Sequence, residues 1–353
     1  MKNILFIRLR LLGDIIFTIP ALEIYKSHCP QSNIYYVVEE KFREIAELIP
    51  GVHQVITVPG KMSIKEHFRF LKQMKVLDLD AVVDFHSGPK SALLTRISGA
   101  KTRVGYKTPN RNWAYNCLTP RKFGASSSPT HSTFNQAKLL EHLGITVTKS
   151  GIPLYPLLSY AENKVAQDIK NILYSIETGD LKRIVIHVGA GNLFRDWGIE
   201  NFSGLIERLT ADRVTVFLVG HSEEEKKKGA YLTERHGLNG TLNGAHRVNR
   251  VHDLTGRLSI ADMLFLISGV NVYFGVDSGP LHLASLTQTP LVALYGPNIP
   301  EISGPWRKKN VTIIQLPLTC RPCSQRRCIH ETIKCMKNIK TDVVYEAIIR
   351  YLS

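Results

Sequence analysis

The sequence predicts an α/β fold with two doubly wound domains, each built around a parallel sheet. Three observations lead to this prediction. The chain has 353 residues, which favours two domains at roughly 100–200 residues per domain. Short apolar runs alternate with longer amphipathic stretches, as in strand–helix–strand units. That alternation breaks near the middle of the chain and then starts again.

The predicted strands are short runs rich in Val and Ile. Several of them are apolar throughout, which is typical of parallel strands that are covered on both faces. In chain order they are residues 4–7, 34–38, 55–58, 81–85, 183–187, 214–219, 272–276 and 291–295.

The stretches between these runs predict helices, at residues 20–26, 91–97, 162–173, 200–210 and 260–267. The pattern breaks on Gly and Pro at residues 151–156, so we expect domains at residues 1–155 and 156–353. The last helix could pack back on the first domain. Doubly wound sheets bind ligands at the carboxyl ends of their strands, so the expected site is a cleft between the two domains.

The composition limits the possible partners. Lys and Arg total 45 against 30 for Asp and Glu, and this net charge of +15 indicates anionic partners. Zinc-finger spacing, RNA-binding aromatic motifs and helix-turn-helix patterns are absent from the sequence, so we do not expect nucleic acid to be the partner. No apolar run reaches the ~18–20 residues that span a bilayer, and the first residues predict a buried strand, not a signal peptide. We therefore expect a cytoplasmic protein.

Residues 6–15 carry the first candidate chemistry. A predicted strand ends, Gly13 permits a tight turn, and Asp14 falls at or near the start of a helix. Aspartate is common as a helix N-cap, which is one interpretation. The other is that Asp14 is a general base at the end of a strand, with Arg8 and Arg10 nearby to hold an anionic substrate.

Two further segments predict an anion site. After the strand at 183–187, Gly189 and Ala190 would let backbone N–H groups approach a phosphate, and Arg195 would neutralise it. After the strand at 272–276, residues 277–282 place Asp, Ser, Gly and His in one turn, with Pro280 suited to the first helical position. The N–H groups of such a helix start bind diphosphate, although an ordinary capped helix would look similar.

Four of the six cysteines fall within sixteen residues, as Cys320, Cys323, Cys328 and Cys335. Disulfides are disfavoured in a cytosolic protein, and four thiolates suit a tetrahedral structural zinc or iron. Only the first pair has the usual two-residue gap, so free or redox-active thiols remain the alternative.

These segments, in this order, resemble the bacterial heptosyltransferase family, glycosyltransferase family 9, whose members build the inner core of lipopolysaccharide. The resemblance covers nearly the whole chain. The matching segments are residues 8–15, 20–22, 37–40, 84–88, 189–190, 195–197, 254–256, 277–284, 290, 295–296, 304–305 and 335–336.

The resemblance implies a GT-B fold with two Rossmann-like domains facing a central cleft, the acceptor on the first domain and the nucleotide-sugar on the second. It implies inverting transfer of heptose from ADP-heptose to a lipopolysaccharide inner-core acceptor, without a catalytic cofactor and with transient contact to the inner membrane surface. The family's general base falls on Asp14.

The remaining family positions fall on both halves of the sequence. The implied donor-binding residues are Gly189, Ala190, Arg195, Glu223, Asp277, Ser278, Gly279 and His282. The implied acceptor-binding residues are Arg8, Arg10, Gly13 and His86. Two positions depart from the family pattern. Arg195 stands where the family has lysine, and His86 with Ser87 stands where relatives often have Gln-Gly.

Other functions stay open from the sequence alone. A protein O-heptosyltransferase of the same family would use a side-chain acceptor, and some such enzymes carry a metal-bound cysteine finger. A nucleotide-sugar epimerase with the same two-domain architecture would change the donor without an acceptor. A non-catalytic binding protein would need Asp14 only as an N-cap.

Overall fold

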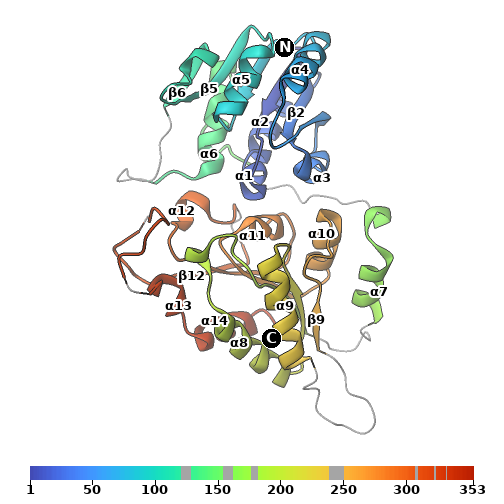
Figure 1. Cartoon of the computed structure of the whole chain (residues 1–353), viewed down its shortest axis with the longest axis vertical. Coiled ribbons are helices and arrows are strands. Elements are labelled where there is room, and N and C mark those ends of the chain that lie inside the picture. Colours follow the sequence, from blue (N-terminus) through green and yellow to red (C-terminus); the bar gives the residue numbers. More distant parts are fainter. Residues whose placement is uncertain are drawn as a thin grey trace. The chain divides into compact units, whose positions relative to one another are not determined.

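The computed structural model describes residues 1–120, 129–153, 162–175, 182–237, 250–306, 309–321, 323–330 and 332–353. The chain divides into two compact units, Met1–Leu158 and Ser159–Ser353 (Figure 1). The predicted boundary, between residues 155 and 156, lies outside the described residues.

The first unit is a six-stranded parallel sheet with the strand order β3-β2-β1-β4-β5-β6. In this order the chain moves outward from β1 in one direction and then from β4 in the other, so the point of reversal lies between β1 and β4. Its elements are β1 (Asn3–Ile7), α1 (Leu12–Ile16), α2 (Ile19–His28), β2 (Asn33–Glu39), η1 (Glu40–Phe42), α3 (Arg43–Glu47), β3 (Val52–Val58), α4 (Ile64–Val76), β4 (Ala81–Asp84), α5 (Pro89–Ile97), β5 (Thr102–Lys107), η2 (Asn112–Ala114), β6 (Cys117–Pro120), α6 (Ser132–Ala137) and η3 (Lys138–Leu143).

The second unit repeats this topology, with the strand order β12-β11-β10-β7-β8-β9 and all pairs parallel. Here the reversal lies between β7 and β10. Its elements are η4 (Glu162–Lys164), α7 (Gln167–Ser175), β7 (Arg183–His187), η5 (Leu193–Arg195), α8 (Ile199–Ala211), β8 (Thr215–Val219), α9 (Glu223–His236), β9 (Val251–Asp253), α10 (Ile260–Ser268), β10 (Val272–Val276), α11 (Gly279–Ala284), β11 (Leu291–Leu294), α12 (Pro300–Ser303), β12 (Val311–Ile314), α13 (Lys334–Lys337) and α14 (Thr341–Ile349).

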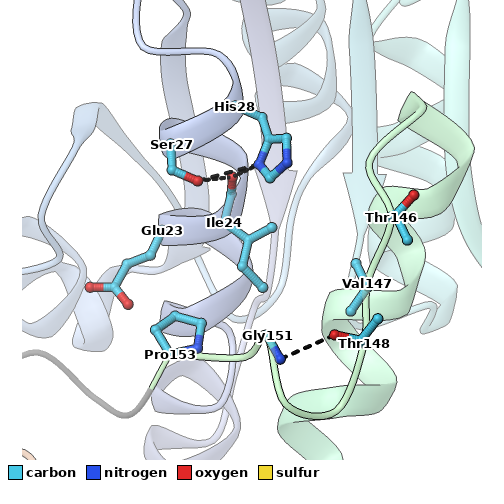
Figure 2. A pocket seen from close by; sticks show the side chains of 9 residues that line it. All are labelled: Glu23, Ile24, Ser27, His28, Thr146, Val147, Thr148, Gly151 and Pro153. Atoms are coloured by element: carbon cyan, nitrogen blue, oxygen red, sulfur yellow. Dashed lines mark hydrogen bonds between the residues drawn. The ribbon is translucent and has the colours of Figure 1, made fainter.

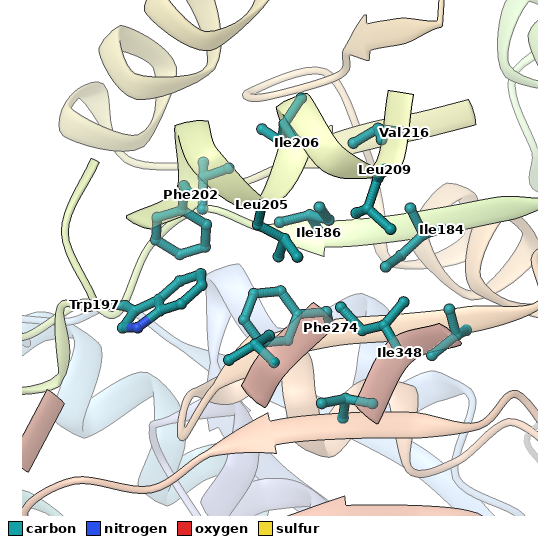
Figure 3. Close-up of a cluster of buried hydrophobic side chains, with 14 of the residues drawn as sticks. Ile184, Ile186, Trp197, Phe202, Leu205, Ile206, Leu209, Val216, Phe274 and Ile348 are labelled. Atoms are coloured by element: carbon teal, nitrogen blue, oxygen red, sulfur yellow. The ribbon is translucent and has the colours of Figure 1, made fainter. Parts of the chain in front are cut away.

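Apolar strands bury both faces of each sheet, as the continuous Val and Ile runs predict. In the second unit, alternate residues of β7 enter two different clusters: Ile184 and Ile186 lie in one, and Val185 lies in the other. Figure 3 shows the first of these clusters, where Trp197 packs edge-on against Phe202 and Phe274 with ring centroids 5.1 and 5.4 Å apart.

Trp197 anchors the loop that follows β7. Its ring is fully buried, and its indole N–H donates a 2.9 Å hydrogen bond to the carbonyl of Ile339. The final helix, α14, packs against α8 and adds Val344 and Ile348 to the same cluster, so its buried face is used within the second unit. The loop preceding α8 is therefore attached to a rigid core only two residues after Arg195.

The structure confirms the predicted fold class, with two parallel α/β sheets. Each of the eight predicted strands overlaps an observed strand. The prediction missed β5, β6, β9 and β12. Three of these four lie at the edges of their sheets, where strands are short and partly exposed and so are not apolar throughout.

Within the described ranges, no helix combines the length and the apolar character that crossing a bilayer requires.

Candidate functional site

The first group of candidate residues lies at the chain reversal of the first sheet. β1 and β4 are adjacent, with Ile7 opposite Asp84, so the loops that follow them leave the sheet side by side. Arg8 joins these loops, because its Nη1 donates a 2.7 Å hydrogen bond to the carbonyl of Phe85. Arg8 is 5% exposed, which is rare for an arginine unless it is paired.

Asp14 is the partner of Arg8. The Asp14 carboxylate forms an ion pair with Nη2 of Arg8, and its side chain is about one-third exposed. The N-cap interpretation of Asp14 is wrong, because α1 begins at Leu12 and Leu11 occupies the N-cap position. Leu11 has a positive φ of 63° and is 63% exposed, a strained backbone that sets the direction in which the helix starts. Asp14 is thus held in place and still reachable.

His86 lies in the loop after β4, which is organised by a buried carboxylate. Asp84 accepts hydrogen bonds from the backbone N–H groups of His86 and Ser87 and from the Tyr115 hydroxyl, each at 2.8 Å. Burial raises the pKa of the Asp84 carboxyl, and these donors act in the opposite direction. Gly88 leaves room for the His86 ring, since a Cβ there would come within 2.6 Å of it. The other two predicted acceptor residues are Arg10, which is exposed, and Gly13, which is buried.

The second group lies at the corresponding reversal of the second sheet. Arg195, in the loop after β7, donates from Nη1 to the carbonyl of Asp277 at 3.0 Å, and Nη1 is 3.4 Å from the Asp277 carboxylate. His282 Nε2 lies 3.7 Å from the same carboxylate, and Asn298 donates a hydrogen bond to it. Burial raises the pKa of Asp277, but the hydrogen bond from His282, the charges of Arg195 and His282 and the Asn298 bond outweigh it, so the net pKa is lowered.

Asp277 therefore stays an anion that holds two cationic or hydrogen-bonding side chains in place. The structure brings Arg195, Asp277 and His282 together, as the sequence predicted for the donor residues. Gly279 begins α11, and Ser278 occupies its N-cap position without using its hydroxyl as a cap. The first backbone N–H groups of α11 have no partner within the helix, which is the general property of a helix start.

Two further buried side chains, His187 and Glu225, form a chain of contacts that ends at Ser278. The Ser278 hydroxyl lies 3.3 Å from Nδ1 of His187, and Nε2 of His187 lies 3.4 Å from Oε1 of Glu225. The other carboxylate oxygen of Glu225 accepts the N–H groups of His221 and Ser222 at 2.7 and 2.9 Å. Burial raises the pKa of Glu225, but the hydrogen bond and charge of His187 and these backbone donors outweigh it. The net pKa lies well below its usual range.

The position of Glu225 also explains why residue 189 is a glycine. A Cβ at Gly189 would lie 1.8 Å from Oε1 of Glu225, so the loop needs glycine here to leave room for that carboxylate. Ala190 is half-buried and packs against the hydrophobic core. The predicted donor residue Glu223, by contrast, is exposed at the start of α9 and pairs with Lys226 at 2.7 Å.

The sequence prediction missed His187, Glu225 and Asn298. A signal for Glu225 was present, because Ser222 followed three residues later by glutamate is a capping box, and the structure contains that box. His187 ends a predicted strand, and so belonged to the set of strand-end residues. Asn298 follows the predicted strand at 291–295, and so it also belonged to the strand-end loops.

The structure does not support the predicted structural metal at the four cysteines. All four thiols are free and half-buried. Burial raises the pKa of the Cys335 thiol, and the charges of Cys320, Cys328 and Cys323 add to this effect. The described residues hold no group of three or more His, Cys, Asp or Glu side chains placed to bind a metal ion.

A separate cavity of about 510 Å³ lies in the first unit, between α2 and the loop before residue 154 (Figure 2). Burial raises the pKa of Glu23 on its wall to about 7. Its described lining residues are Glu23, Ile24, Ser27, His28, Thr146, Val147, Thr148, Gly151 and Pro153. This lining carries no lysine or arginine, so we place the candidate site at the strand-end loops, where the cations lie.

Comparison with known proteins identifies the family of this chain. The family model for glycosyltransferase family 9 (heptosyltransferase) matches residues 67–334. The chain belongs to glycosyltransferase family 9, and it is accordingly a glycosyltransferase that uses a nucleotide-sugar donor.

Three similar proteins illustrate the relationship. Lipopolysaccharide heptosyltransferase 1 of Pseudomonas aeruginosa is 26% identical over 344 residues, covering 93% of this chain and 88% of the relative. The solved structure of ADP-heptose lipopolysaccharide heptosyltransferase II of E. coli aligns with a TM-score of 0.76 at 20% identity, covering 100% and 98% of the two chains. The E. coli heptosyltransferase WaaC with ADP aligns with a TM-score of 0.71 at 20% identity, covering 99% and 100%.

Proposed function

We propose that this enzyme transfers a heptose from ADP-heptose to a sugar of the lipopolysaccharide inner core, with inversion at the anomeric carbon. The single observation that carries this proposal is the pairing of Arg195 with Asp277 across the loops of β7 and β10, at the reversal of the second sheet. In doubly wound sheets this is where nucleotides bind, and Arg195 supplies the charge that a diphosphate needs.

The second unit, in this proposal, holds the donor. The ADP diphosphate lies against Arg195, His282 and the first N–H groups of α11, while Ser278 offers a hydroxyl that His187 orients. Negative charge grows on the leaving diphosphate during transfer, and cations and N–H groups that are already in position stabilise it without reorganisation. Because Arg195 and His282 are held by the buried Asp277, their positions are fixed before the donor arrives.

The first unit, in this proposal, holds the acceptor. Asp14 removes the proton from the acceptor hydroxyl as that oxygen attacks the anomeric carbon from the face opposite the leaving group. Arg8 fixes the orientation of the Asp14 carboxylate and is itself fixed by the Phe85 carbonyl. Arg10 and His86 are the proposed contacts to the acceptor, and Gly13 lets the chain turn close to it.

The reaction is proposed to run without a catalytic cofactor, because Arg195 and His282 provide the charge stabilisation that a divalent ion provides elsewhere. The net charge of +15 suits an acceptor that carries phosphate and carboxylate groups and lies in an anionic membrane surface. We therefore propose a cytoplasmic enzyme that contacts the inner membrane only at its surface.

A donor and acceptor screen tests this function. Purified enzyme is incubated with ADP-heptose and a delipidated lipopolysaccharide core, with GDP- and UDP-sugars as competing donors, and the products are weighed by mass spectrometry. We expect the core to gain the mass of one heptose, only with ADP-heptose, and NMR to show the opposite anomeric configuration to the donor. No gain with any donor contradicts the proposal, and a changed sugar in the absence of acceptor indicates an epimerase.

A further inference from the structure

Gln325 lies in the cysteine-rich segment, whose role the predicted chemistry does not explain. Its side-chain amide uses both ends. Oε1 accepts hydrogen bonds from Nε of Arg195 at 2.9 Å and from Nδ2 of Asn192 at 3.0 Å. Nε2 donates to Oδ1 of Asn298 at 2.7 Å. A flipped amide would face the guanidinium with its NH₂ group, so these partners fix its orientation.

Contacts within the segment around Gln325 hold this amide in place. Gln325 has a positive φ of 56°, a conformation that costs a non-glycine residue free energy and persists only where the surroundings hold it. Its backbone N–H donates to Sγ of Cys323 at 3.4 Å, and the N–H of Cys323 donates to the carbonyl of Pro297 at 3.1 Å. The turn is thus attached to the loop after β11, which also contains Asn298.

These contacts close a ring around Arg195. Its Nη1 bonds to Asp277, its Nε bonds to Gln325, and Gln325 reaches back to Asp277 through Asn298. Within the described part of the chain, Nη2 of Arg195 has no hydrogen-bond partner. A guanidinium presents its N–H groups in a fixed plane, so holding Nε and Nη1 determines where Nη2 points.

We propose that Gln325 is a positioning residue that aims the Arg195 guanidinium at the donor diphosphate. This inference rests on the proposed function, since it assigns Arg195 to that diphosphate. It also gives the cysteine-rich segment a role, which is to hold Gln325 in its strained conformation beside the donor site.

The alternative is a purely structural role, in which Gln325 only attaches its own segment to the rest of the second unit. Two readouts separate these roles. A positioning residue affects ligands that carry phosphate, whereas an attachment affects thermal stability and all ligands alike. A positioning residue also loses its effect when Arg195 is absent, because its action passes through that side chain.

The test uses the full-length enzyme and isothermal titration calorimetry with ADP, and with adenosine as the phosphate-free probe. Gln325→Met keeps the length of the side chain and removes its hydrogen bonds. Gln315→Met is the matched control, because Gln315 donates to the Asn298 carbonyl at 2.9 Å and does not contact Arg195. Gln325→Ala serves as a second variant, and melting curves check that each variant is folded.

We expect Gln325→Met to weaken ADP binding up to about tenfold, because the released Arg195 side chain must then be ordered when ADP binds. Adenosine binding and Gln315→Met should each stay within about twofold of wild type. In an Arg195→Ala background, Gln325→Met should change ADP binding less than about twofold.

Three results would overturn the inference alone: unchanged ADP binding in both Gln325 variants, equal losses for ADP and adenosine, or an undiminished effect in the Arg195→Ala background. If the wild-type enzyme does not bind ADP at all, the proposed function itself fails, and the inference falls with it.

Discussion

Gly189→Ala gives the sharpest test of how the donor loops are packed. A Cβ at this position would meet three atoms of Glu225, at 1.8, 2.2 and 2.3 Å, so the glutamate must move. Glu225 is 8% exposed and accepts two backbone hydrogen bonds beside its contact with His187. Losing hydrogen bonds to a buried charged group costs about 1.5–3 kcal/mol.

We therefore expect Gly189→Ala to lower the free energy of unfolding by about 2 kcal/mol. For the second unit, Ser159–Ser353, this corresponds to a melting temperature lower by about 4–8 °C. Differential scanning calorimetry measures this change. Gly204→Ala is the matched control, because a Cβ there meets nothing closer than 3.8 Å, and alanine favours its helix, α8.

The cause can be isolated with a double variant. If the clash with Glu225 is the reason, Gly189→Ala should cost little in a Glu225→Ala background, where the obstructing atoms are gone. A Gly189→Ala enzyme that melts within 1 °C of wild type, or a cost that persists without Glu225, would refute this account of the loop.

Two further predictions concern single charges. Burial raises the pKa of Glu23 from its ordinary value of 4.5 to about 7, so the folded state binds the proton more tightly and stability falls as pH rises between those values. Glu23→Gln should melt like wild type at pH 4 and above it at pH 8; equal melting at both pH values contradicts the burial argument. Arg195→Lys keeps the charge but loses the planar donors that reach Asp277 and Gln325, so calorimetry should show ADP binding about tenfold weaker. Wild-type affinity in that variant would mean that geometry at this position is unimportant.

The fold was predictable where burial dominates the sequence. Central strands such as β1, β7 and β10 have continuous apolar runs in their interiors because both faces of each sheet are covered, and this leaves a plain signal. Edge strands lack that signal: β6 has the sequence Cys117, Leu118, Thr119 and Pro120 and is only half-buried. The order of strands in each sheet depends on long-range pairing, which no local pattern contains.

The candidate site was predictable where its residues lie in the segments that follow buried strands. Asp14, Arg195 and residues 277–282 each come soon after a buried strand, and parallel strands of one sheet end at the same edge. Glu225 and Gln325 come from a helix and from an irregular segment, so only tertiary folding brings them to His187 and Arg195. The cysteine spacing suggested a metal, and the structure instead places the Gln325 amide there, bonded to Arg195 and Asn298.

The central proposal is that Asp14 acts as the general base while Arg195 and His282 bind the donor diphosphate. One paired measurement tests it most directly. Transfer rates and ADP affinity are measured together for Asp14→Asn and His282→Ala, with wild type as the reference. We predict that Asp14→Asn loses at least about a hundredfold in transfer rate, as expected for a general base, and binds ADP like wild type. His282→Ala should instead bind ADP more weakly. Near-normal transfer by Asp14→Asn would contradict the account.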